Sequence, residues 1–95
     1  MTIQEFQRLI ESIYLRKDSA RGIPANVAWL MEEVGELSRA LRKRDEPEIA
    51  GEFADVLAWL CTLASIAGVD LERVASAKYG GGCPKCRQAS CVCEG

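Results

Sequence analysis

The chain has 95 residues, of which 48% are hydrophobic and 27% are charged, and its formal net charge is −2. These values indicate one small soluble domain that does not bind nucleic acid, and a weakly acidic chain needs bound cations to hold a polyanionic substrate. Histidine is absent, which excludes Ser-His-Asp hydrolysis, Cys-His catalysis and zinc sites with histidine ligands.

We expect neither a targeting segment nor a membrane span. No apolar run approaches the roughly 20 residues that a membrane span needs, and Met1 to Glu5 lack the charged and apolar regions of a signal peptide. The expected location is the cytoplasm, without a membrane partner. A domain of this size buries only about 60–65% of its unfolded surface, and oligomerisation is a common remedy.

The first predicted helix covers residues 3–17. Thr2 and Glu5 have the spacing of a capping box, and apolar residues follow at helical spacing: Phe6, Leu9, Ile10, Ile13 and Tyr14. Residues 18–25 are predicted to be a loop because they include a glycine and a proline. Arg21 in this loop, with Arg16 and Lys17 just before it, is either a solvated charge or a phosphate contact.

The second predicted helix covers residues 26–43, with Asn26 as a candidate cap. One face forms a stripe that we expect to be buried, made of Val27, Leu30, Met31, Val34 and Leu41. A second face carries Trp29, Glu33, Glu36 and Ala40. A helix with two such faces suits a bundle that also forms a dimer. Trp29 packs in the core or dimer interface, or stacks on a nucleotide base.

The third predicted helix begins near Pro47, with Asp45 as cap and Glu48 in a capping-box position, and ends before Gly68. One of its faces carries Glu52, Asp55, Val56, Trp59, Leu63 and Ile66. The two acids therefore lie at the start of a helix face whose remaining residues are apolar and are expected to lie in the core. An unpaired buried carboxylate there would be unfavourable, so something must compensate it.

A short fourth helix is predicted over residues 71–79, capped by Asp70 and closed by three consecutive glycines. No segment has the pattern of a strand. We therefore predict an all-α bundle of about four helices over residues 1–80, followed by a glycine hinge and a cysteine-rich tail over residues 81–95.

The tail carries a C-x₂-C pair, then four residues, then a C-x-C pair, formed by Cys83, Cys86, Cys91 and Cys93. Two closely spaced thiol pairs are typical of a tetrahedral zinc site, and so short a segment has no core of its own. Structural Zn²⁺ is the predicted occupant, with disulfides or a reactive thiol as alternatives. Cys61 lies in an apolar helix and is interpreted as a core residue.

The second and third helices each present two acids three residues apart, Glu33 with Glu36 and Glu52 with Asp55. Residues at this spacing lie on one side of a helix, so two antiparallel helices bring four carboxylates together. Clustered oxygens favour Mg²⁺ or a similar hard cation. The alternative is an ordinary glutamate-rich surface. Glu32 falls toward the polar side of its helix.

These residues resemble a known family. Glu32-Glu33-Val34-Gly35-Glu36-Leu37, followed by Glu52-Phe53-Ala54-Asp55-Val56, is similar to the E-E-x-x-E and E-x-x-D signature of the MazG-like nucleotide pyrophosphohydrolases. The similarity covers most of residues 1–80. The resemblance implies an all-α fold, a homodimer or a dimer of dimers, and Mg²⁺-dependent hydrolysis of nucleoside triphosphates, ribo or deoxy, to the monophosphate and pyrophosphate.

By this resemblance, the metal ligands are Glu33, Glu36, Glu52 and Asp55. Glu32 or Glu33 accepts the proton of the attacking water. Candidate substrate contacts are Lys78, Trp29 and Arg21. The chain departs from the family pattern at Ala75, where many relatives carry asparagine, and at Gly80, where proline is usual, which leaves Lys78 as the candidate contact of the fourth helix.

Two other functions remain open at this point. The first alternative is hydrolysis of phosphoribosyl-ATP. Enzymes for this reaction share the helical architecture, so the sequence separates it poorly from hydrolysis of nucleoside triphosphates. The second alternative is a non-enzymatic, zinc-bearing helical interaction module whose acids are structural or bind a basic partner.

Overall fold

The computed structural model describes all residues from Met1 to Gly95 and contains four α-helices and no strands. The helices are α1 (Ile3–Arg21), α2 (Ile23–Lys43), α3 (Glu46–Ile66) and α4 (Leu71–Tyr79). The all-α prediction is therefore confirmed, with four helices in the expected order.

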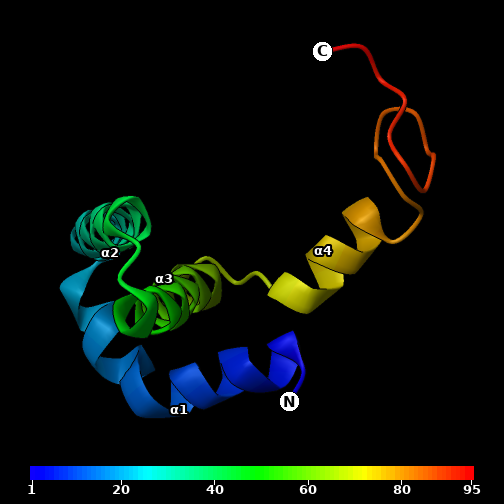
Figure 1. The fold of residues 1–95 in the computed structure, drawn as a ribbon. Helices are drawn as coiled ribbons and strands as arrows, with labels where there is room; N and C mark the ends of the chain where they lie inside the picture. Colours follow the sequence, from blue (N-terminus) through cyan, green and yellow to red (C-terminus); the bar gives the residue numbers. More distant parts are fainter.

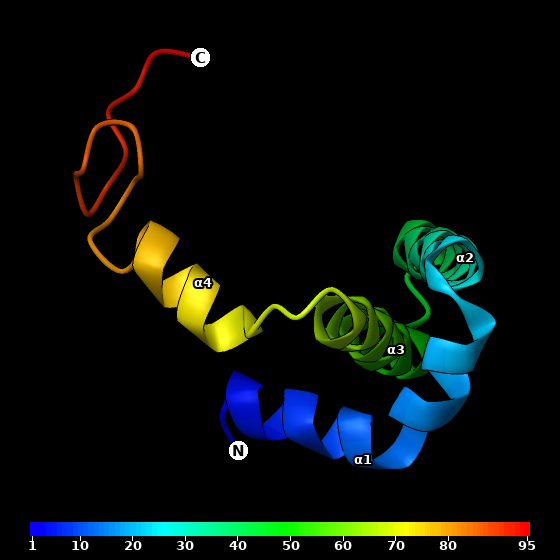
Figure 2. The same ribbon diagram turned by 180° about the vertical axis from the view of Figure 1, so that it is seen from behind.

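The long α3 is the centre of the molecule, because it packs against both α2 and α1. Figure 1 and Figure 2 show that α4 leads away from this three-helix unit and carries the tail outward, so the two chain termini are well separated. The smaller α4 packs against α1. The site-bearing helices and the tail thus occupy opposite ends of the structure.

The connection between α1 and α2 is a single residue, which corrects the predicted loop over residues 18–25. Gly22 has φ 91° and ψ 162°, and it separates two otherwise adjacent helices. A glycine adopts this left-handed φ without steric conflict. Pro24 falls in the first turn of α2, where its missing N–H removes no helical hydrogen bond. Glycine and proline therefore delimit two helices here without a loop.

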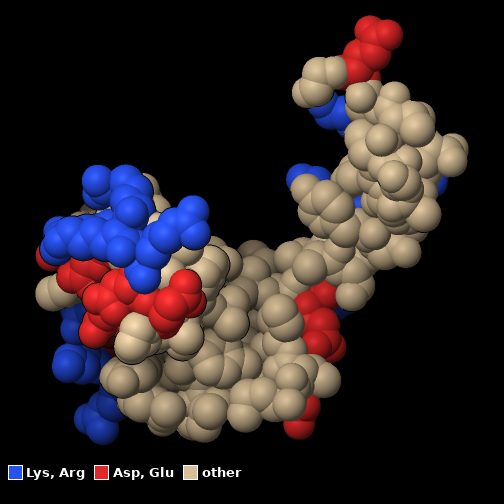
Figure 3. Space-filling view, in the orientation of Figure 1, with Lys and Arg blue, Asp and Glu red and all other residues tan.

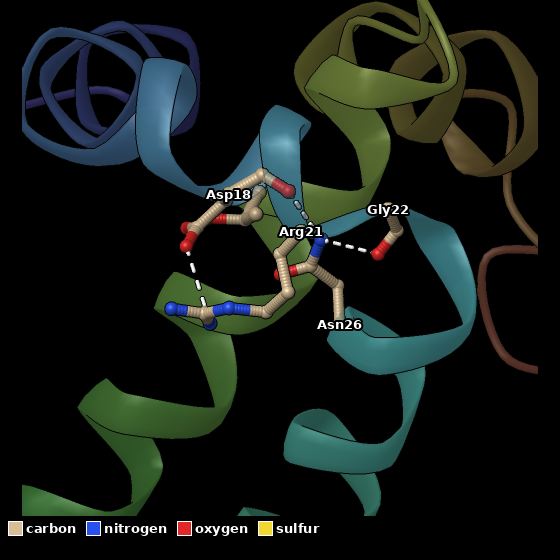
Figure 4. Close-up of polar contacts among 5 residues, drawn as sticks. Asp18, Arg21, Gly22 and Asn26 are labelled. Carbon is tan, nitrogen blue, oxygen red and sulfur yellow. Dashed lines mark hydrogen bonds and ion pairs between the residues drawn. The ribbon is translucent and has the colours of Figure 1, made fainter.

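Asn26 does not cap α2, contrary to prediction; it lies inside the first turn and is fully buried. Its side-chain amide donates to the carbonyl oxygen of Asp18 at 2.7 Å and to that of Gly22 at 2.8 Å. Figure 4 shows this amide between the end of α1 and the start of α2. One side chain therefore fixes the two helices at their junction.

The other predicted helix ends are mostly confirmed. Thr2 and Glu5 form the capping box of α1, and the side chain of Asp70 accepts from the Arg73 amide at 3.0 Å at the start of α4. Asp45 stands at the N-cap of α3, but its side chain makes no capping hydrogen bond, so the predicted capping box is absent.

A polar network attaches the start of α4 to α1. The amide of Gln7, a buried residue, donates to the Ser65 hydroxyl at 3.0 Å and to the Val69 carbonyl at 2.8 Å. Its carbonyl oxygen accepts from the Leu71 backbone amide at 2.9 Å. The side-chain amide of Gln7 thus makes three hydrogen bonds, two as donor and one as acceptor, so this buried glutamine stabilises the turn from α3 into α4.

The predicted buried stripe of α2 is largely exposed in a single chain. Val27 is 40% exposed and Met31 is 58% exposed, and only eight residues of the whole chain are buried. The reason is that one copy supplies only α3 as an extensive neighbour of α2. Cys61 is a core residue, as predicted, with no exposed surface.

The apolar character of α3 was underestimated from the sequence. By length and composition alone this helix could cross a membrane, since an 18-residue window has a mean hydropathy of 1.5. The expectation that no apolar run approaches that length is therefore wrong. The central helix of a helical bundle has the same composition, and α3 packs against helices on two sides.

We expect Asn26→Ala to lower the free energy of unfolding by about 2–3 kcal/mol, because two hydrogen bonds in a buried site are lost together. Urea unfolding followed by circular dichroism measures the difference. Ser19→Ala is the matched control, since Ser19 is an exposed residue of the same segment. Equal stability of the two variants would show that the Asn26 amide does not hold the junction.

Candidate functional site

The acidic cluster lies where α2 and α3 pack together. The two helices are joined by a two-residue connection in which Arg44 adopts a left-handed φ of 52°, so the chain reverses and the helices run antiparallel. Glu33, Glu36 and Glu52 each place a carboxylate oxygen within 4.8 Å of the others. The Glu33–Glu36 pair of α2 is thus brought to Glu52 of α3, so three of the four carboxylates expected in one cluster converge.

Two of these carboxylates have buried oxygens without partners. One oxygen of Glu33 and one of Glu52, both Oε2, are buried and accept no hydrogen bond. A buried carboxylate oxygen is unfavourable unless a donor or a cation compensates it. The positions of these oxygens, and the hard-ligand chemistry of carboxylates, fit a divalent cation such as Mg²⁺.

The electrostatics of the cluster follow from its crowding. Desolvation, together with repulsion from Glu36, Asp55 and Glu52, raises the pKa of Glu33 to about 7. Desolvation and the neighbouring charges of Glu36 and Asp55 also raise the pKa of Glu52. Both groups are therefore held in a state where the negative charge is disfavoured, and a bound cation would reverse that preference.

Asp55 lies beside this cluster, not within it. It is exposed in the single chain, which corrects the expectation of a buried carboxylate in a core strip. One turn of α3 separates it from Glu52, and its charge raises the pKa of both Glu33 and Glu52. Glu32 is exposed and belongs to neither the cluster nor the adjoining cavity.

An open cavity of about 250 Å³ adjoins the acids. Three helices line it: α1 with Tyr14, Lys17, Asp18 and Arg21, α2 with Trp29 and Glu33, and α3 with Asp55, Ala58, Trp59 and Thr62. Carboxylates, cations and aromatic rings therefore meet in one space, a combination suited to a ligand with both charged and planar parts.

Two tryptophans form the aromatic wall of this cavity. The rings of Trp29 and Trp59 are stacked, with centroids 6.0 Å apart and an interplanar angle of 9°. The guanidinium of Arg21 lies 5.7 Å from the centre of the Trp59 ring and 3.3 Å from the Asp18 carboxylate. Trp29 is 45% exposed, so its ring is accessible to a ligand.

The cation wall was only partly identified from the sequence. Arg21, with Lys17 just before it, was a candidate phosphate contact, but Tyr14 and Thr62 were missed as site residues. Tyr14, Lys17 and Arg21 are three or four residues apart, which places them on one helical face once α1 is known to reach residue 21. Because residues 18–25 were predicted to be a loop, Arg21 was not placed on the same helix as Tyr14 and Lys17.

Lys78 is not brought to the cavity by a single chain. It lies in the last turn of α4, with its ammonium 5.7 Å from the centre of the neighbouring Tyr79 ring. Because α4 packs against α1 and points away from the α2–α3 pair, Lys78 does not line the cavity.

A second group of candidate metal ligands lies in the tail. The sulfur atoms of Cys83, Cys86, Cys91 and Cys93 are all within 4.8 Å of one another. Hydrogen bonds from the backbone amides of Val92 and Gln88 lower the pKa of the Cys86 thiol to about 6. The tail therefore has soft sulfur ligands, whereas the helices have hard oxygen ligands.

Charged side chains are distributed unevenly around the acidic cluster. Figure 3 shows lysine and arginine side chains gathered beside a patch of aspartate and glutamate at the α2–α3 end of the molecule. The last turn of α2 contributes Arg42 and Lys43, while the first turn of α3 contributes Glu46 and Glu48. Positive charges at the C-terminus of α2 and negative charges at the N-terminus of α3 are both favoured by the helix dipoles.

Comparison with known proteins identifies the family. A search of curated proteins gave no match, but the family model for the MazG nucleotide pyrophosphohydrolase domain matches residues 21–87. This match spans more than half of the chain and includes every carboxylate of the acidic cluster. The protein therefore belongs to the MazG nucleotide pyrophosphohydrolase family.

Proposed function

We propose that this protein hydrolyses a nucleoside triphosphate, ribo or deoxy, to the monophosphate and pyrophosphate in a Mg²⁺-dependent reaction. The observation that carries the proposal is the cavity in which three acids, two cations and two stacked tryptophans meet. A nucleotide has the complementary parts, namely a planar base and an anionic triphosphate that binds through cations. Membership of the family supports the same reaction class.

The proposed metal ligands are Glu33, Glu36, Glu52 and Asp55. The first three have converging oxygens, and the partnerless oxygens of Glu33 and Glu52 fit a cation. Asp55 lines the same cavity as Glu33, one turn of α3 from Glu52. When bound, Mg²⁺ supplies positive charge that neutralises triphosphate oxygens and makes a water a better nucleophile.

Other residues of the cavity are proposed to contact the substrate. Trp29 and Trp59 offer ring faces to the base, and Lys17 and Arg21 are positioned for phosphate oxygens. Lys78 would reach a substrate only from a second copy of the chain, because it lies outside this cavity in one copy. The hydrolysed bond is the anhydride between the first and second phosphates, which releases pyrophosphate.

Glu33 is the proposed proton acceptor for the attacking water. Glu33 lines the cavity, and a carboxylate within hydrogen-bond reach of a water can accept its proton. Glu32 is a weaker candidate, since its exposed side chain is absent from the cavity.

We further propose that the active form is a homodimer or a dimer of dimers. A compact monomer of this mass exposes about 5,400 Å², whereas one chain exposes 6906 Å². Part of this difference is the extended tail. Another part is the apolar surface of α2 and α3, where Met31 is 58% and Phe53 is 53% exposed. A second copy of the chain would cover this surface.

We expect Asp55→Ala to reduce turnover about 100-fold or more, because a ligand and a negative charge are lost from the cavity. The measurement is pyrophosphate release from a panel of nucleoside triphosphates at saturating Mg²⁺. Circular dichroism should show an intact fold, since the change relieves repulsion. Glu46→Gln, an exposed acid of α3 outside the cluster, is the control and should retain activity. Unchanged turnover in Asp55→Ala would refute the assignment.

The raised pKa of Glu33 predicts a pH dependence of stability in metal-free protein. Between its ordinary value of 4.5 and about 7, the folded chain retains a proton that the unfolded chain releases. The free energy of unfolding therefore falls as pH rises through this window. Glu33→Gln should flatten that slope, measured by thermal unfolding in EDTA from pH 5 to pH 8.

Mg²⁺ provides the complementary test. It should raise the melting temperature of the wild-type protein at pH 8, and raise it less in Glu33→Gln, since a cation stabilises only the folded cluster. An identical pH slope and an identical Mg²⁺ effect in the two proteins would contradict the electrostatic description of Glu33.

We expect Phe53→Lys to shift the protein from dimer to monomer, because a charge would be buried in an apolar interface. Sedimentation equilibrium over a range of protein concentrations measures the mass. Val92→Lys is the control, since Val92 is 72% exposed but lies in the tail, and it should remain dimeric. A monomeric wild-type protein at every concentration would overturn the assembly.

A further inference from the structure

The cysteine tail is the one cluster of potential ligands that hydrolysis does not use. It follows α4, and Figure 2 shows it projecting away from the three helices that form the cavity. No residue from 81 to 95 is fully buried, so the segment has no apolar core. Its compact backbone loop therefore requires another source of stability.

The sulfur atoms have the spacing of a tetrahedral metal site. Four thiolates at about 2.3 Å from a zinc ion are about 3.8 Å from one another. The sulfurs of Cys83 and Cys93 are 3.8 Å apart, and all four sulfurs lie within 4.8 Å of one another. A disulfide needs about 2.05 Å, and every cysteine of the chain is free.

The backbone is folded to make the sulfurs converge. The Arg87 amide donates to the Cys83 carbonyl at 2.7 Å, and the Cys83 amide donates to the Gln88 carbonyl at 2.9 Å. Gly82 has φ +100°, and a Cβ there would lie 2.6 Å from the Gln88 carbonyl oxygen. Only glycine fits this close approach, so the sequence is adapted to a closed loop around the first two cysteines.

The surroundings also suit a metal bound by sulfur. The Cys93 amide lies 3.3 Å from the Cys91 sulfur and donates to it, as backbone groups around thiolate ligands do. A zinc ion with four thiolates has a net charge of −2, which Lys85 and Arg87 within the loop offset. Charge and hydrogen bonding thus agree with the geometry.

We propose that Cys83, Cys86, Cys91 and Cys93 bind one structural Zn²⁺ ion that holds the tail in its folded form. The protein fills all four positions of the tetrahedron, so no position is open for a substrate or water. Soft thiolates select zinc, while the carboxylates of α2 and α3 select magnesium. The chain therefore carries two separate metal sites of different chemistry.

The test is the zinc content of the purified full chain, measured by mass spectrometry without nucleotide or Mg²⁺. Wild-type protein should contain one zinc per chain, and the double variants Cys83→Ser/Cys86→Ser and Cys91→Ser/Cys93→Ser should contain less than a tenth of that. Cys61→Ala is the matched control, because this fifth cysteine is buried in α3, and it should keep its zinc. Circular dichroism should show that every variant keeps its helices.

Cobalt substitution gives a second readout, because the spectrum of the wild-type protein by itself reports the geometry of the site. Wild-type protein loaded with Co²⁺ should show the strong visible absorption of a tetrahedral ion and a thiolate charge-transfer band, and both should be absent from the double variants. Zinc retained by the double variants, a six-coordinate cobalt spectrum, or a zinc-free wild type with disulfides would each overturn the proposal.

Discussion

The repulsion among the carboxylates between α2 and α3 is the constraint on which the structure depends. Helix packing brings Glu33 and Glu52 so close together that the pKa of each is raised and each keeps a buried oxygen without a hydrogen-bond partner. A chain optimised only for stability would place apolar residues at these positions. The retained repulsion therefore supports the proposed cation site.

The rest of the molecule holds this unfavourable cluster in position. The apolar length of α3 packs between α1 and α2, while the buried amide of Asn26 fixes the junction of α1 and α2. The same junction sets Arg21 beside Asp18 and over Trp59. Packing energy from one part of the fold thus keeps opposite charges and repelling charges at defined places in one small cavity.

Local signals in the sequence predicted the elements well. The Thr2–Glu5 capping box, the Asp70 cap and the acids at i, i+3 spacing all depend on residues within one helical turn, and the structure confirms the caps and the helical placement of the acids. The junction at Gly22 was not predictable in the same way. Glycine followed by proline is compatible both with a loop and with one helix ending where another begins.

Burial was harder to predict than secondary structure, because it depends on which surface covers which. Apolar spacing identified the stripe containing Val27 and Met31 correctly as a face, but it could not indicate that one copy leaves that face open. Asp55 was misjudged for the same reason. The identity of Asn26 gave no sign of its bridging role, which arises only once α1 extends to residue 21.

The single residue between α1 and α2 has a geometric consequence for the cavity. Lys17 and Arg21 line one wall of the cavity from α1, and Trp29 and Glu33 line a second wall from α2. Gly22 is the one residue between these helices, so its backbone dihedral angles set the angle between them. A rotation of a few degrees about its φ and ψ changes the separation of the two walls. Asn26, in α2, donates to the carbonyl of Asp18 in α1 and to that of Gly22 itself, and thereby restrains this rotation.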